Sequence, residues 1–254
     1  MKKVKIFLIV LLACGLLYVG DMFLGNPISY LMVKQHSREY IREKYPAELQ
    51  LQLGDIYHDW YNGGGYDIEV TSPVSQDTRF SLSYDRLGRL NWDSYEMSVA
   101  SGNSTLSRLY TEYAVLVDAA LGDMIGNNIC KPSLSAIDIY SGEPVPLPQG
   151  IDQAALVLDA EYDVAELGKE YGYLSLDIYD TAENISVEKA AEYLLKIKTA
   201  MDEAEVGFYS IDLFMIEQDT KDSEKSLLLN GITYEDLNAE NVISRLTKRW
   251  EQQQ

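Results

Sequence analysis

Histidine and cysteine are scarce in this chain of 254 residues, which contains two of each. Zinc enzymes usually hold their metal through several histidine or cysteine side chains. His36 and His58 belong to different predicted elements, so they do not provide a multi-histidine site. We therefore expect neither a bound metal nor a cofactor.

The motifs of the common enzyme classes are also missing. The sequence has no Gly-x-Ser-x-Gly elbow, no Gly-x-x-x-x-Gly-Lys-Ser/Thr loop, no His-Glu-x-x-His pair and no Gly-x-Gly-x-x-Gly loop. Gly63-Gly64-Gly65 lacks the buried strand and the helix that flank a nucleotide-binding loop. We interpret it as a hairpin connection and assign no catalytic residues.

Basic residues are half as frequent as acidic ones. The chain has 21 lysines and arginines against 40 aspartates and glutamates, a formal net charge of −19. Such a charge repels phosphate polymers at long range, so nucleic acid is not expected as a partner. Because carboxylates are so numerous, pairs at any spacing arise by chance, and no pair is singled out as a catalytic site.

Only two thiols are present, and they are far apart in the sequence. Cys14 lies inside an apolar N-terminal run, so Cys130 is the one thiol left for the rest of the chain, and no disulfide is expected there. A neighbouring Lys131 would lower the pKa of Cys130 slightly, but a lone cysteine without a nearby base favours a structural role.

The apolar N-terminal run extends from Ile6 to Leu24, and Asp21 is its one charged residue. With about 1.5 Å of rise per residue, this run is long enough to cross ~30 Å of hydrocarbon. Three lysines precede it, at positions 2, 3 and 5, which predicts that they stay in the cytoplasm. We expect residues 1–25 to form a transmembrane signal-anchor and the rest of the chain to be extracytoplasmic.

Two other interpretations of this segment remain open. Leu11-Leu12-Ala13-Cys14-Gly15 is similar to a lipobox, in which Cys14 would be lipidated, although the residues after it stay apolar. An ordinary cleaved signal peptide is the third reading. All three place the bulk of the chain outside the cytoplasm.

Hydrophobic periodicity then predicts an N-terminal α+β domain over residues 26–125. A helix is expected from about residue 28 to 45, followed by strands in which apolar residues alternate, as at Tyr66, Ile68 and Val70. A second amphipathic helix is expected from about residue 104 to 122. Prolines and glycines are frequent over residues 126–152, which we interpret as a linker, with a candidate strand at 136–140.

A second α+β domain is predicted over residues 153–254. Strands are expected near 174–178, 208–216 and 226–234, with a helix over 187–204 and a closing helix over 241–250. Asn230-Gly231 fits either a tight hairpin or a bulge. The predicted fold class is thus α+β: an N-terminal transmembrane helix followed by two small domains with antiparallel sheets.

An aromatic cluster near the glycine turn is the candidate binding surface. It consists of Tyr57, Trp60, Tyr61 and Tyr66. Aromatic rings near a loop stack on sugars or peptides, although ordinary core packing is the more common role of such residues.

Several segments resemble the YfjL-like family of Gram-positive, membrane-anchored proteins. The resemblance begins at Gly25-Asn26-Pro27-Ile28-Ser29 and includes Gly64-Gly65-Tyr66 and Val70-Thr71-Ser72-Pro73. It continues in the C-terminal half at Tyr171-Gly172 and Phe208-Tyr209-Ser210-Ile211-Asp212, and covers most of residues 1 to 216. It implies a two-part extracytoplasmic protein and implies no activity.

Together these patterns predict a membrane-anchored, extracytoplasmic protein that binds, senses or associates with the envelope without catalysis. One alternative is a surface hydrolase that uses carboxylates. Another is a regulatory partner of a second membrane or cell-envelope protein, which the N-terminal helix would contact.

Overall fold

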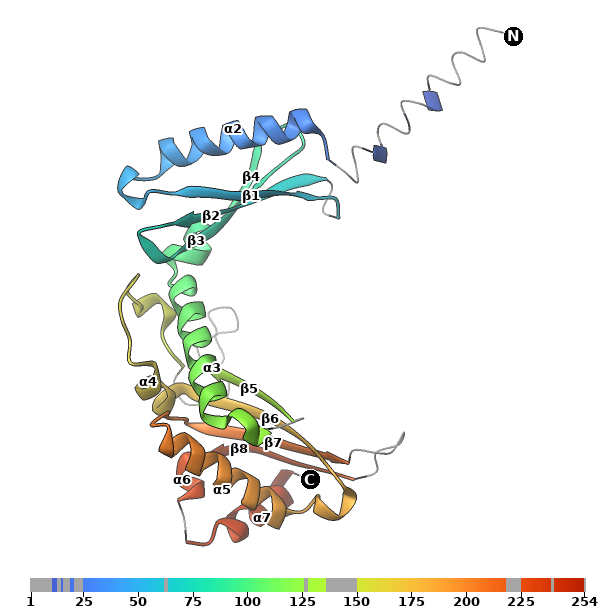
Figure 1. The fold of residues 1–254 in the computed structure, drawn as a ribbon, viewed down its shortest axis with the longest axis vertical. Coiled ribbons are helices and arrows are strands. Elements are labelled where there is room, and N and C mark those ends of the chain that lie inside the picture. Colours follow the sequence, from blue (N-terminus) through green and yellow to red (C-terminus); the bar gives the residue numbers. More distant parts are fainter. Residues whose placement is uncertain are drawn as a thin grey trace, which may run out of the picture. The chain divides into compact units, whose positions relative to one another are not determined.

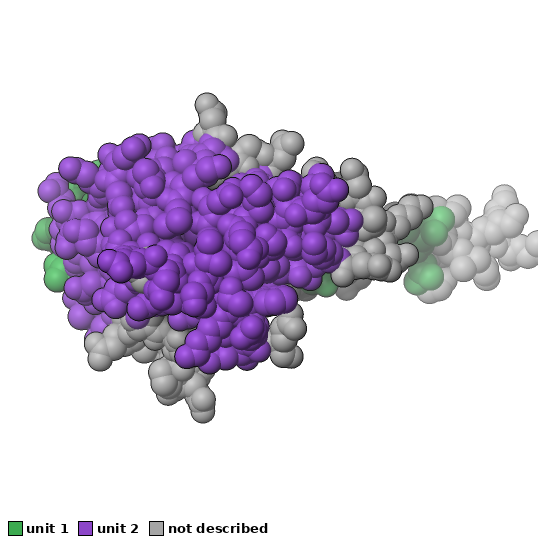
Figure 2. Space-filling model, turned by 90° about the horizontal axis from the view of Figure 1, so that it is seen from below, with its two compact units in different colours: residues 1–105, 157–159 green, residues 106–156, 160–254 purple. Residues whose placement is uncertain are grey.

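A computed structural model describes residues 11–12, 15, 19–20, 25–61, 64–125, 128–135, 150–217, 225–238 and 240–253 (Figure 1). The chain divides into two compact units, which Figure 2 distinguishes by colour. The first unit contains residues up to Thr105 together with Val157–Asp159, and the second contains Leu106–Leu156 and Ala160–Gln254. Each unit has its own four-stranded sheet and its own hydrophobic core.

The predicted transmembrane helix has to be corrected. Among the residues that the structure describes, no helix is both long and apolar enough to cross a bilayer. Helix α2 (Pro27–Lys44), which follows the predicted anchor, has 18 residues but carries charged side chains from Lys34 to Lys44. Most of the run from Ile6 to Leu24, including Cys14, lies outside the described residues.

In the first unit, α2 packs on one face of a sheet whose strands follow chain order. The strands are antiparallel: β1 (Gln52–Asp59), β2 (Gly65–Ser72), β3 (Ser75–Tyr84) and β4 (Leu90–Asp93). Alternation along β2 and β3 places Tyr66, Ile68, Val70, Phe80, Leu82 and Tyr84 in the core. A short 3-10 turn (Ala47–Leu49) precedes β1, and a π-helical turn (Glu96–Ala100) follows β4.

The bounds of α2 follow from its sequence. The side chain of Asn26 accepts a hydrogen bond from Ile28 N at 2.9 Å, and Pro27 occupies the first helical position. The helix ends before Tyr45, which is extended because it precedes Pro46.

The partly buried carboxylate of Asp93 joins α2 to β4. Its Oδ2 atom accepts hydrogen bonds from Tyr40 (2.7 Å), Lys44 (2.6 Å) and Tyr45 (2.5 Å), and its Oδ1 atom accepts one from Tyr95 N (2.9 Å). Burial alone would raise the pKa of Asp93, but the donors Lys44, Tyr45 and Tyr40 outweigh it and lower that pKa. Tyr45, in turn, has a raised pKa because of its burial and its bond to the carboxylate.

The second unit has the sheet order β5-β6-β7-β8. Its strands are β5 (Ile129–Leu134), β6 (Gly172–Asp180), β7 (Ser210–Glu217) and β8 (Ser226–Thr233). The predicted all-antiparallel sheet is wrong here, because β6 and β7 are parallel. Helix α5 (Val187–Glu203) connects these two strands. Such a helical crossover lets the second strand run in the same direction as the first.

Helices cover one face of this second sheet. They are α3 (Asn103–Ile125), α4 (Val164–Tyr171), α5, α6 (Tyr234–Leu237) and α7 (Val242–Gln253). Two 3-10 turns, Gln153–Ala155 and Ala182–Asn184, precede α4 and α5. Leu109, Tyr113 and Val117 of α3 belong to this core, whereas the sequence pattern predicts this helix as part of the first domain.

The region interpreted as a linker, residues 126–152, contains β5, which pairs with β6 along its whole length. The candidate strand at 136–140 lies outside the described residues. At Asn230-Gly231 the structure has a bulge rather than a hairpin. Leu213 pairs with Leu229 and Ile211 with Ile232, so one extra residue is accommodated on β8, where Gly231 has a φ of 63°.

We predict that Asp93→Asn destabilises the protein by about 1–3 kcal/mol at pH 7, because it removes the charged acceptor of three side-chain donors. The pKa of Asp93 is lower in the folded protein than its ordinary 3.8. Its contribution is therefore complete above that pH and is lost as the pH falls through the folded value. Urea unfolding at pH 7 and pH 3 measures both effects.

The matched control is Asp55→Asn on the same sheet, where the carboxylate is exposed. It should change the free energy of unfolding by less than about 0.5 kcal/mol at either pH. If the two variants lose the same stability, the Asp93 cluster does not stabilise the fold.

Candidate functional site

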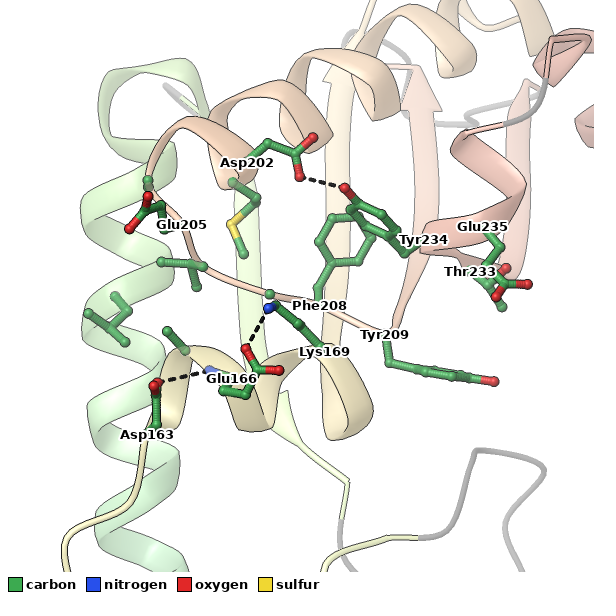
Figure 3. Close-up of a pocket in the computed structure, with 16 residues that line it drawn as sticks. Asp163, Glu166, Lys169, Asp202, Glu205, Phe208, Tyr209, Thr233, Tyr234 and Glu235 are labelled. Carbon is green, nitrogen blue, oxygen red and sulfur yellow. Dashed lines mark hydrogen bonds and ion pairs between the residues drawn. The ribbon is translucent and has the colours of Figure 1, made fainter.

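A cavity of about 930 Å³ opens in the second unit. Its walls come from the start of α4, the end of α5, the segment 204–209, and the junction of β8 with α6; Leu116 of α3 contributes as well (Figure 3). This volume lies in the range of sites that hold small organic ligands.

The wall formed by residues 204–209 results from a sharp reversal after α5. Glu205 adopts a left-handed conformation with a φ of 57°, and Val206 N donates to Met201 O at 2.9 Å. The chain then packs directly on α4, where Gly207 N donates to Ala165 O at 3.1 Å. A Cβ atom on Gly207 would lie 2.7 Å from Lys169 N and 2.9 Å from Ala165 O, so only glycine fits.

Aromatic side chains form the apolar part of the cavity. Phe208 is buried, and its ring meets the ring of Tyr234 edge to face, with 5.2 Å between centroids. The hydroxyl of Tyr234 donates to Asp202 Oδ1 at 2.8 Å, and Lys198 Nζ donates to Asp202 Oδ2 at 2.5 Å. The hydrogen bond with Asp202 raises the pKa of Lys198, so this lysine stays charged.

Carboxylates surround the aromatic part. Five acidic residues line the cavity: Asp163, Glu166, Asp202, Glu205 and Glu235. Figure 3 shows Glu205 and Asp163 on one side and Glu235 on the other, at the start of α6. The one basic lining residue, Lys169, forms an ion pair with Glu166, which raises the pKa of the lysine. The cavity is therefore acidic and suits a cationic group.

All five of these carboxylate residues are exposed. A catalytic carboxylate pair needs one member held in its protonated form by burial or by a close second carboxylate. Exposed residues around an open cavity are better suited to attracting a ligand than to proton transfer.

The structure separates the four aromatic residues of the predicted binding surface. Tyr66 is only 3% exposed and belongs to the core of the first unit, where its hydroxyl donates to Asn26 O at 3.1 Å. Tyr57, Trp60 and Tyr61 are 63%, 50% and 81% exposed. Alternation of side chains along the strands explains the burial of Tyr66, because its side chain points to the face of the sheet that α2 covers.

The two histidines lie in the first unit. The ring of His58 packs on Tyr66, with 5.2 Å between centroids. His36 Nδ1 lies 2.6 Å from Gly88 O, a hydrogen bond that fixes the turn between β3 and β4.

Cys130 lies on β5 and is partly buried against the core of the second unit. Burial raises the pKa of its thiol to about 12, and Asp118 adds to the effect. The slight lowering of the Cys130 pKa by Lys131, which the sequence predicts, does not occur. Successive side chains on a strand point to opposite faces, and Lys131 Nζ lies 4.0 Å from Asp177 instead.

The sequence pattern does not indicate the cavity. Asp163, Glu205 and Glu235 come from three separate segments, and in a chain with 40 acidic residues none of them stands out. The one indication in the sequence is Gly207. It lies between the amphipathic helix α5 and a strand, where the chain has to turn.

Comparison with known families assigns both halves of the chain. Residues 1–94 match the YfjL-like N-terminal domain, and residues 112–247 match the YfjL-like C-terminal domain. The chain belongs to the YfjL-like family. The resemblance expected from the sequence is thus confirmed, and the interval between the two YfjL-like matches contains the division of the structure after Thr105.

No curated protein and no solved structure matches the chain. The YfjL-like matches name domains and carry no activity, membrane anchor or Gram-positive origin with them.

We predict that Gly207→Ala destabilises the second unit by about 1–3 kcal/mol, because the added methyl group collides with backbone atoms of α4. Thermal or urea unfolding followed by circular dichroism measures the loss. Ala204→Ser, an exposed position in the same segment, is the control and should change stability by less than about 0.5 kcal/mol. Equal stability of both variants and the native protein would contradict the tight contact.

Cys130 is expected to resist iodoacetamide in the folded protein at pH 8, because a thiol with a pKa of about 12 is almost entirely protonated there. Mass spectrometry of the peptide that contains Cys130 measures the modified fraction before and after unfolding in urea. Rapid labelling in the native state, at the rate of the urea-unfolded chain, would show that the thiol is accessible and ionised.

Proposed function

We propose that this protein is a non-enzymatic binding module and that the acidic cavity of its second unit is the binding site. The observation that carries the proposal is the combination of a cavity of about 930 Å³, an aromatic interior and five surrounding carboxylate residues. An organic cation with an apolar body matches this combination, since its charge faces the carboxylates and its body faces Phe208 and Tyr234.

The electrostatics of the site support a cationic ligand. Lys169 and Lys198 are each paired with a carboxylate, which leaves Glu205 and Glu235 as exposed acidic groups on opposite sides. The chain as a whole carries a net charge of −19, so its long-range field also attracts cations.

The non-enzymatic character is inferred from the chemistry of the described groups. The cavity contains no histidine or cysteine, its carboxylates are exposed, and the thiol of Cys130 has a raised pKa. The extracytoplasmic location expected from the sequence stays a prediction, as does association with an envelope protein.

The test is a ligand-observed NMR screen of small amines, matched neutral analogues and carboxylic acids against the full chain. We expect binding to favour the amines. Glu205→Gln combined with Glu235→Gln should weaken binding of the amine hits about fivefold, since each exposed contact contributes up to ~1 kcal/mol.

The control combines Glu188→Gln with Glu251→Gln, which changes the net charge equally at exposed positions outside the cavity. It should leave binding unchanged. Hits without charge preference, or equal losses in both double variants, would show that the cavity is not the site.

A further inference from the structure

The charges that line the cavity of the second unit do not cancel. Of the five lining carboxylate residues, Glu166 and Asp202 each have a lysine partner. The other three, Asp163, Glu205 and Glu235, form no ion pair with any residue that the structure describes. Asp163 accepts a backbone hydrogen bond from Glu166 N at 3.0 Å, which leaves its charge in place. Three negative charges of the cavity are therefore left for a ligand.

These three carboxylates stand on two sides of the cavity. Asp163 lies at the start of α4 and Glu205 in the turn after α5, and Figure 3 shows both on one side. Glu235, in the first turn of α6, lies on the opposite side. A ligand that pairs with all of the unpaired carboxylates therefore needs positive charge at both of its ends.

Two arginines near Glu235 are engaged by another residue. Arg245 and Arg249 each form an ion pair with Asp236, at 3.4 Å and 3.0 Å. Asp236 also accepts hydrogen bonds from Thr233, which close the capping box of α6. Glu235 is exposed and keeps its charge for a ligand.

An apolar stretch separates the two acidic sides. Figure 3 shows the rings of Phe208 and Tyr234 between Glu205 and Glu235. Lys169 also lies in this middle part, but its ion pair with a neighbouring glutamate offsets its charge. The order across the cavity is thus acid, apolar ring, acid.

We propose that the ligand of the cavity is a linear polyamine. Its ammonium group at one end faces Asp163 and Glu205, the ammonium group at the other end faces Glu235, and the methylene groups between them pack on Phe208 and Tyr234. The inference rests on the proposed function and narrows its organic cation to a cation with charge at both ends. Alkyl amines have pKa values close to that of lysine, so both ends are charged at pH 7.

Other cationic ligands match this arrangement less well. A monoamine pairs with one side and leaves the other side without a partner. A basic peptide brings backbone N–H and C=O groups that need hydrogen bonds, which the rings in the middle do not offer. Within the described part of the chain, no group of three acidic, histidine or cysteine residues is placed to hold a metal ion.

The experiment compares hexamethylenediamine with hexylamine, which has the same carbon chain and one amino group fewer. Each is titrated into the full chain at pH 7 and about 0.15 M salt, where diffuse attraction by distant charges is screened beyond ~8 Å. We expect the diamine to bind at least about fivefold more tightly, because it forms one further ion pair. Its two equivalent ends alone account for a factor of about two.

Variants remove the charge of one side at a time. Glu235→Gln neutralises one side, and Asp163→Asn with Glu205→Gln neutralises the other; asparagine preserves the cap of α4. Either change should bring the diamine to within about twofold of hexylamine. Hexylamine itself should weaken by no more than about twofold, because the remaining side still pairs with it.

The control is Glu251→Gln, which removes one exposed charge outside the cavity and should leave the ratio of the two affinities unchanged. Circular dichroism checks that each variant is folded, as expected for substitutions of exposed side chains.

The outcomes separate this inference from the proposed function. If hexylamine binds and the diamine is no more than about twofold tighter, the polyamine assignment is wrong while the cavity remains a site for cations. If Glu251→Gln reduces the advantage of the diamine as much as Glu235→Gln does, the attraction comes from the net charge and the assignment is again wrong. If neither amine binds, the proposed function fails together with the inference.

Discussion

The contact between Tyr113 and the backbone of Gly207 holds the second unit together. The hydroxyl of this fully buried tyrosine donates to Gly207 O at 2.9 Å, and burial raises its pKa, so it remains a donor. Gly168 and Gly172 lie against the same ring, where a Cβ on either residue would collide with it. One side chain from α3 thereby positions α4, the start of β6 and the segment that forms the cavity wall.

In both units helices pack closely on a sheet, but the contacts that allow this differ between the units. In the first unit, a narrow row of serine and valine allows α2 to approach the sheet, and Asp93 binds the end of the helix through charge-assisted hydrogen bonds. In the second unit, close glycine contacts and a large apolar core replace that polar cluster. The proposed binding site lies in the second unit, at the acidic cavity.

The elements that could be predicted are those encoded by residues close together in the sequence. The alternation at Tyr66, Ile68 and Val70 and the apolar face of α5 predicted real elements, because each periodicity reports directly on burial. The parallel direction of β7 relative to β6 was missed, although the predicted order strand, helix, strand over residues 174–216 is typical of a parallel crossover. The membership of α3 in the second core was not predictable, because it depends on contacts between residues far apart in the sequence.

By itself the sequence determined the α+β class, a helix from about residue 28 to 45 and the acidic character, because these follow from local periodicity, from the breaker Pro46 and from composition. The YfjL-like family followed from the resemblance of individual segments. Only the tertiary structure decided that Tyr66 is buried while Trp60 and Tyr61 are exposed, and that Asp163, Glu205 and Glu235 surround one cavity. The reason is physical: exposure and proximity depend on which faces pack together, and packing is a property of the whole folded chain.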